Sequence, residues 1–140
     1  MQLDKVQPKN KRQLKQLINY AFKHNIYDLN FIDTSEITDM SLLFSNRMHN
    51  FDVSSWDVSN VTNMGYIFYH CKNFNCDLSN WDVSKVKNMN YMFYNCKNFN
   101  CNLSDWDISN MTRWKNIFCG CDKITIPNWY KKLYIVKNKI

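Results

Sequence analysis

Residues 56–71 read WDVSNVTNMGYIFYHC and residues 81–96 read WDVSKVKNMNYMFYNC, so one unit recurs almost letter for letter 25 residues later. Residues 106–121, WDISNMTRWKNIFCGC, form a third copy at the same spacing, and a shorter degenerate copy begins at Ile32. A fixed period of this length is the sequence signature of a repeat architecture. We therefore expect about four repeats over residues 31–121.

A unit this short cannot bury an apolar face alone, so the repeats must stack and share one core. Alternation over residues 81–83 predicts a short strand, and the apolar spacing over residues 89–96 predicts a short helix. The expected fold is therefore an α/β repeat. Specifically, we predict a right-handed, leucine-rich-repeat-like solenoid with one short strand and one short helix in each coil of about 25 residues.

The two ends of the chain differ from the repeats and predict caps. Residues 10–25 place these apolar side chains at the spacing of one helix face: Leu14, Leu17, Ile18, Ala21 and Phe22. Asn10 and Gln13 resemble a capping box at the start of that helix. We expect residues 1–30 to form an N-terminal helical cap over the first repeat.

At the other end, residues 124–130 alternate up to Pro127 and predict a final strand. Residues 122–140 would then form a C-terminal cap of strand and tail. With the two caps and the repeats sharing one core, residues 1–140 are expected to form a single solenoid domain.

The basic residues are concentrated at the two ends of the chain. Of the formal net charge of +6, residues 1–30 contribute six Lys or Arg against two acids and residues 122–140 contribute five against one, whereas residues 31–121 hold seven against nine. Basic clusters at the caps favour phosphate binding, but terminal repeats also need a polar exterior. Binding of nucleic acid or an anionic surface through these caps is therefore the alternative hypothesis.

No pattern of catalytic residues recurs with the repeat. His24, His49 and His70 are out of register with one another, and a chain with two glycines has no glycine-rich phosphate loop. We predict that the protein is not an enzyme and has no cofactor. The start of the chain lacks the apolar run of a signal peptide, and no stretch is long enough for a membrane span. A cytoplasmic location is expected, with a secreted mature form as the open alternative.

The motif WDVSNVTNMGYIFYHCKNFNCDLSNWDVS, from residue 56, resembles the repeat of the BspA-like bacterial leucine-rich-repeat surface proteins. That repeat was first described as a Mycoplasma-type repeat of unknown function. The similarity extends over roughly residues 31–130. The resemblance implies an open solenoid with adhesive or protein-binding roles, often at a bacterial surface.

The tryptophan of each repeat shares a face with a β-branched residue, which favours a place in the core. Its neighbours in sequence should then face outward and form the binding surface. These neighbours are Asp57, Asp82 and Asp107, beside Ser55, Asn80 and Asp105.

Stacked aspartates repel one another, so each needs a compensating group. Asx-type turns, a cation or a basic partner would each serve, and a turn cap is the favoured reading. The cysteines also fall in columns. We interpret them as small, buried, reduced thiols, with disulfides between stacked neighbours as the open alternative, and expect no metal site.

These features together predict a non-enzymatic protein-interaction module. It would bind an unidentified protein partner through the strand face and the loops at the coil edges. The chain is expected to be a monomer or to associate weakly end to end.

Overall fold

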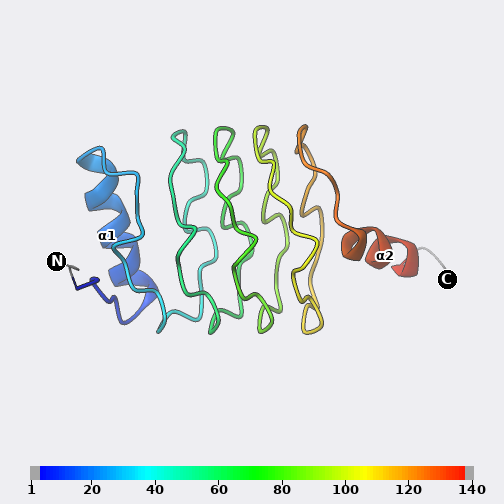
Figure 1. Ribbon diagram of the computed structural model, residues 1–140, viewed down its shortest axis with the longest axis horizontal. Coiled ribbons are helices and arrows are strands. Elements are labelled where there is room, and N and C mark those ends of the chain that lie inside the picture. Colours follow the sequence, from blue (N-terminus) through cyan, green and yellow to red (C-terminus); the bar gives the residue numbers. More distant parts are fainter. Residues whose placement is uncertain (1–3, 138–140) are drawn as a thin grey trace.

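The structure is a computed structural model that describes residues 4–137. Figure 1 shows the repeats as irregular loops standing side by side in a row, with a helix at each end. Helix α1 spans Lys11–Lys23 and helix α2 spans Asn128–Lys137. Neither of these two described helices is long and apolar enough to cross a membrane.

The predicted leucine-rich-repeat-like solenoid with one strand and one helix per coil is wrong. Between α1 and α2, the described chain contains no helix and no extended strand, and its bridges are isolated parallel pairs such as Asn63 with Asn88. The repeats are built from turns and loops. The leucine-rich-repeat and solenoid descriptions therefore do not apply to this fold.

Two left-handed residues per repeat explain why no helix forms at the apolar spacing. Tyr66 and His70 have φ angles of 60° and 58°, and Tyr91 and Asn95 have 56° and 58°. An α-helix needs right-handed backbone at every position, and a left-handed residue in each turn breaks it. We call the parts of the repeats that contain these residues the turn segments: residues 37–47, 61–71, 86–96 and 111–121.

The turn segments are joined by a row of hydrogen bonds from alternate backbone amides. Within one segment, the amides of Met64, Tyr66, Phe68 and His70 donate to carbonyls of the following repeat at 2.8–3.0 Å. The intervening amides donate within the repeat, as Ile67 does to the Met64 carbonyl. Two kinds of bond thus alternate along each segment, and every pair of neighbouring repeats is held in register.

The core consists of aromatic columns that run through all the repeats. The rings of Phe44, Phe68, Phe93 and Phe118 succeed one another at centroid distances of 5.8, 5.5 and 5.7 Å, with interplanar angles of 5–14°. Phe51, Phe74 and Phe99 form a second column beside the first. Equivalent residues of successive repeats therefore bury one another, as the period of the sequence predicts.

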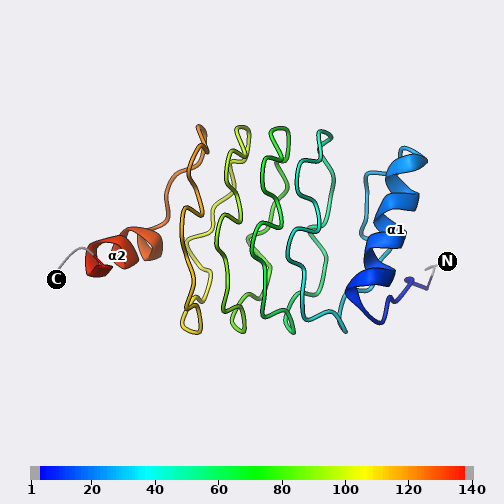
Figure 2. The same cartoon turned by 180° about the vertical axis from the view of Figure 1, so that it is seen from behind.

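Helix α1 confirms the predicted N-terminal helix and its cap. The Asn10 side chain accepts a hydrogen bond from the Gln13 amide at 3.0 Å, and the Gln13 side chain accepts one from the Lys9 amide at 2.7 Å. Leu14, Ile18 and Ala21 are buried against the core. Figures 1 and 2 show α1 lying along the full height of the first loop.

The predicted C-terminal strand is wrong, because helix α2 begins at Asn128, directly after Pro127. Proline is favoured at helix starts, where its missing N–H is not needed. The Trp129 indole donates to the Leu103 carbonyl at 2.8 Å, as the repeat tryptophans do to their preceding repeats. The first turn of α2 thereby makes the hydrogen bond that the tryptophan of a further repeat would make. The tail at residues 138–140 lies outside the described residues.

The chain's two glycines provide a matched test of the left-handed positions. Gly120 has φ +80°, and an added Cβ would lie 1.9 Å from the Asn95 side-chain oxygen and 3.1 Å from the Asn95 Cα. At Gly65 the φ is not left-handed, and the nearest atom to an added Cβ is a side-chain nitrogen of Asn88. We expect Gly120→Ala to lower the free energy of unfolding by about 1–2 kcal/mol and Gly65→Ala by less. Urea unfolding of both variants measures the difference, and an equal loss would contradict the left-handed assignment.

Candidate functional site

The tryptophans of the repeats are part of the core and are not an exposed stripe. Trp56, Trp81 and Trp106 are 3–5% exposed, and each indole N–H donates at 2.9–3.0 Å to a backbone carbonyl of the preceding repeat. The prediction that they face inward is confirmed. Their neighbours in sequence are therefore free to face outward.

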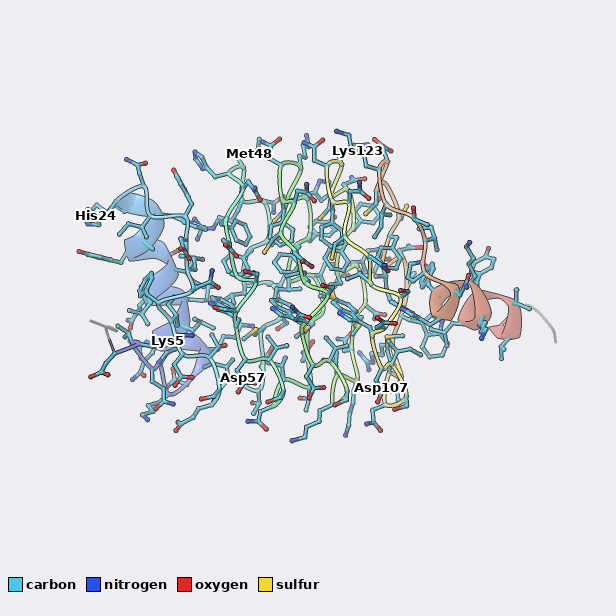
Figure 3. All side chains as sticks on the ribbon, in the orientation of Figure 1. Lys5, His24, Met48, Asp57, Asp107 and Lys123 are labelled. Carbon is cyan, nitrogen blue, oxygen red and sulfur yellow. The ribbon has the colours of Figure 1, made fainter. Side chains whose placement is uncertain are left out.

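All six predicted site residues are exposed. Asp57, Asp82 and Asp107 follow the buried tryptophans, and Ser55, Asn80 and Asp105 precede them. Figure 3 shows Asp57 and Asp107 on the same edge of the molecule, opposite Met48 and Lys123. Because the repeats have no strands, these residues lie on loops and not on a strand face.

Asp57, Asp82 and Asp107 each close a local turn. Asp57 Oδ1 accepts hydrogen bonds from the Ser59 amide at 3.0 Å and the Ser59 hydroxyl at 2.6 Å, and Asp82 is bonded in the same way by Ser84. The favoured reading, an Asx-type turn, is confirmed. The turn fixes each carboxylate in place and leaves it at the surface.

Sequence reasoning missed a second aspartate column that runs parallel to the first. Asp52 and Asp77 accept hydrogen bonds from Ser54 and Ser79, and Asn102 takes the same role with Ser104. The signal was available, because Asp-x-Ser occurs at residues 52–54 and 77–79 as well as at residues 57–59 and 82–84. Asp28, opposite Asp52 in a parallel bridge, continues the column towards α1.

This second column lines an open groove. One section, of about 410 Å³, includes Asp28, Asp52 and Asp77 in its wall, and the next section, of about 390 Å³, includes Asp77 and Asn102. The two sections share Asp77 and its neighbours. This groove, which is lined in part by carboxylates, therefore extends across several repeats.

Most of the charge is segregated between the two sides of the repeats, with Lys5 and Lys85 close enough to Asp33 and Asp82 to help lower the pKa of those carboxyls. The segments 26–33, 51–57, 74–82 and 99–107 contain eight aspartates and no lysine or arginine. We call this set the acidic surface: Asp28, Asp33, Asp52, Asp57, Asp77, Asp82, Asp105 and Asp107. The turn segments contain one acid, Asp39, against Arg47, Lys87, Arg113 and Lys115.

Hydrogen bonds from serine favour the ionised form of four carboxylates on the acidic surface. Hydrogen bonds from the Ser54 and Ser79 side chains lower the pKa of Asp52 and of Asp77 below the ordinary value. Ser84 lowers the pKa of Asp82, and Ser109 lowers that of Asp107, in the same way. At neutral pH the acidic surface therefore presents closely stacked negative charges.

The opposite side carries tyrosines, which sequence reasoning also left unassigned. Tyr66 and Tyr91 stack at a centroid distance of 4.8 Å, and Tyr69 and Tyr94 at 5.3 Å. Lys115 lies 5.8 Å from the centre of the Tyr91 ring. The turn segments thus expose aromatic rings and basic groups where the acidic surface exposes carboxylates.

One column of cysteines is hydrogen-bonded from repeat to repeat. The thiols of Cys71, Cys96 and Cys121 donate to carbonyls of the preceding repeat at 2.9–3.0 Å. All six cysteines are free, and the described residues contain no group of three potential metal ligands. Burial raises the pKa of Cys71 and of Cys121 to about 12 and also raises the pKa of Cys96.

These thiols should differ sharply in reactivity. Of the six cysteines, only Cys119 is exposed, and thiolate formation is suppressed in the buried column. We expect a maleimide to modify Cys119 at least about 100-fold faster than Cys71 or Cys96 in the native protein, and all six thiols at similar rates in denaturant. Peptide mass spectrometry over a time course measures this, and rapid native labelling of Cys96 would contradict its buried position.

Two lysines of the N-terminal cap are partly neutralised by nearby carboxylates. Lys9 lies 3.4 Å from Glu36, and Lys11 lies 3.6 Å from Asp39, whereas Arg12 and Lys15 are exposed. At the other end, Lys131 and Lys132 are exposed on α2. Of the remaining basic residues in this tail, the side chain of Lys137 and all of Lys139 lie outside the described positions.

Comparison with known proteins identifies a family but no function. The family model described as "Mycoplasma protein of unknown function, DUF285" matches residues 12–129, which include α1, all the repeats and the start of α2. No curated protein and no solved structure matches the chain. The match does not confirm the BspA-like leucine-rich-repeat identity. The chain belongs to the Mycoplasma-type family of unknown function DUF285.

Proposed function

We propose that the protein is a non-enzymatic protein-interaction module whose acidic surface binds a basic, extended segment of a partner protein. The observation that carries this proposal is the segregation of charge, with eight aspartates and no basic residue in segments 26–33, 51–57, 74–82 and 99–107. The groove through Asp52 and Asp77 offers a path across the repeats for such a segment.

Repulsion between the stacked carboxylates of the acidic surface favours a cationic partner. Backbone-paired repeats lie about 5 Å apart, so each carboxylate has like charges as neighbours. Two unit charges at about 4 Å interact by roughly 1 kcal/mol in water, and by more where solvent is partly excluded. Lysine or arginine side chains placed along the column would remove this repulsion. Because the serine-bonded turns already fix the carboxylates, little ordering is needed on binding.

Binding of nucleic acid or an anionic surface through the caps is the less favoured alternative. Lys9 and Lys11 already face the carboxylates of Glu36 and Asp39, which reduces the charge available to a phosphate. The exposed Arg12 and Lys15 remain unpaired by these two carboxylates.

The proposal is tested with the triple variant Asp57→Asn, Asp82→Asn and Asp107→Asn. The protein itself shows that asparagine can close this turn, because Asn102 accepts the Ser104 amide at 3.0 Å and its hydroxyl at 2.6 Å. With a lysine decapeptide as the probe, we expect the variant to bind about tenfold more weakly, since each exposed charge pair contributes a few tenths of a kcal/mol to 1 kcal/mol.

A second triple variant, Glu36→Gln, Asp39→Asn and Asp122→Asn, is the matched control. It changes the net charge by the same amount but alters only acids outside the acidic surface, each of which is paired with a lysine. We expect less than a twofold change in its affinity for the decapeptide by isothermal titration calorimetry. Equal weakening in the two variants would show that net charge alone binds the probe, and the proposed surface would be rejected.

A further inference from the structure

In the last repeat, the alternate backbone amides of the turn segment have no hydrogen-bond acceptor among the described residues. In the preceding repeat, the amides of Met89, Tyr91, Phe93 and Asn95 donate to carbonyls of residues 113–119 at 2.8–3.0 Å. The equivalent amides one repeat later have no hydrogen-bond acceptor within residues 4–137. We call this set of N–H groups the donor edge: Trp114, Asn116, Phe118 and Gly120.

Helix α2 does not close the donor edge as α1 closes the opposite end. Figures 1 and 2 show α1 lying along the first loop, whereas α2 projects away from the last one. The contacts of α2 with the last turn segment come from its first residues: the rings of Trp129 and Tyr130 lie 5.9 and 5.2 Å from that of Phe118, and the Tyr130 side chain is hydrogen-bonded to the Ile117 backbone. Asn116 and Cys119 at the edge itself are exposed.

The charge of the donor edge does not suit a second copy. Two copies meeting edge to edge would bring the exposed Arg113 and Lys115 of one copy towards those of the other, and like charges repel. The opposite end of a second copy is covered by α1, whose Lys11 and Asn19 bond to Ser41 and Arg47. Both arrangements disfavour a second copy as the occupant.

The surroundings of the donor edge are basic and partly apolar. Residues 111–132 expose Arg113, Lys115, Lys123, Lys131 and Lys132. Asp122 is the one acid in that stretch, and it is paired with Lys97 at 3.5 Å. On α2, Ile135 and Val136 are more than half exposed. A complementary ligand would carry both negative and apolar side chains.

We propose that the donor edge binds an extended acidic segment of a partner protein, which adds to the last repeat by presenting a backbone carbonyl at every second residue. Strand addition to an unpaired edge is a general mode of peptide recognition in which backbone bonds supply the affinity. Here the occupant takes the place that the next repeat holds in the interior. This site is separate from the acidic surface and selects the opposite charge, so either proposal can fail without the other.

Amide hydrogen exchange by NMR, with the peptide acetyl-(Glu-Val)5-amide as the probe, tests the proposal. In the free protein, the four donor-edge amides should exchange at least about 100-fold faster than the amides of Met89, Tyr91, Phe93 and Asn95. The peptide should slow exchange at the donor edge, and acetyl-(Lys-Val)5-amide should not. Protection of the donor edge without peptide, no slowing by the glutamate peptide, or equal slowing by the lysine peptide would each overturn the proposal.

A pair of substitutions separates the backbone donor from its side chain. Trp114→Pro removes one N–H of the donor edge, whereas Trp114→Ala removes the same side chain and keeps the N–H. Trp114 is not among the left-handed residues, so the backbone there does not exclude proline on that ground. We expect Trp114→Pro to bind the glutamate peptide about five- to tenfold more weakly than Trp114→Ala, as for loss of one hydrogen bond. Equal affinities would contradict pairing through the backbone.

Discussion

Replacing Phe93 with alanine is expected to lower the free energy of unfolding by about 3–5 kcal/mol. The Phe93 ring is fully buried and stacks on Phe68, Phe99 and Phe118 at 4.2–5.7 Å. The smaller side chain would leave a cavity between three repeats that the surrounding backbone bonds prevent from collapsing. Urea unfolding followed by far-ultraviolet circular dichroism measures the change.

The matched control is Phe31→Ala. Phe31 is 37% exposed and has no partner in the phenylalanine columns of the described chain. Its replacement should cost well under half as much as that of Phe93, because less apolar area leaves water when it folds. Equal losses at the two positions would show that the phenylalanine column does not dominate the stability of the core.

Replacing Leu14 with alanine is expected to cost about 2–5 kcal/mol and to weaken the first repeat before the others. Leu14 is fully buried on the inner side of α1, whereas Gln16 on the same helix is exposed and Gln16→Ala serves as the control. Each repeat contacts its neighbours directly, so loss of the cap should loosen the adjacent turn segment first. Amide exchange should therefore accelerate at Met40 and Phe44 more than at Met89 and Phe93. Uniform acceleration would contradict this order.

The sequence was sufficient to predict the period, the buried columns and the N-terminal cap. A period of 25 residues places equivalent phenylalanines in contact, and this holds whatever the backbone does between them. The spacing of Met89, Met92, Phe93 and Cys96 also identified buried positions correctly, since all four are fully buried.

The backbone conformation could not be read from the same pattern. A succession of turns with two left-handed residues buries the same side chains as a helix would, so apolar spacing does not distinguish the two. The left-handed positions of the turn segments hold three asparagines, two tyrosines, one histidine, one leucine and one glycine. Asparagine and histidine are enriched at positive φ, but tyrosine and leucine give no local warning of it. Hydrogen bonding between repeats, and not local preference, selects that conformation.

The candidate site was predicted in part for a similar reason. Outward-facing aspartates followed from the inward-facing tryptophans, and the Asx-type turns were expected. The second column through Asp52 and Asp77 does not adjoin the buried tryptophans in sequence, so the inward position of tryptophan did not predict it. The donor edge has no side-chain signature, because backbone amides carry no mark in the sequence.

Each turn segment is bonded to the next repeat and does not form a helix. NMR scalar couplings across hydrogen bonds test this directly, because they identify the donor nitrogen and the acceptor carbonyl of each bond. The structure predicts couplings from the Phe68 nitrogen to the Met92 carbonyl and from the Phe93 nitrogen to the Ile117 carbonyl. Couplings from the Phe93 nitrogen to the Met89 carbonyl, four residues earlier, would instead establish a helix and contradict the account.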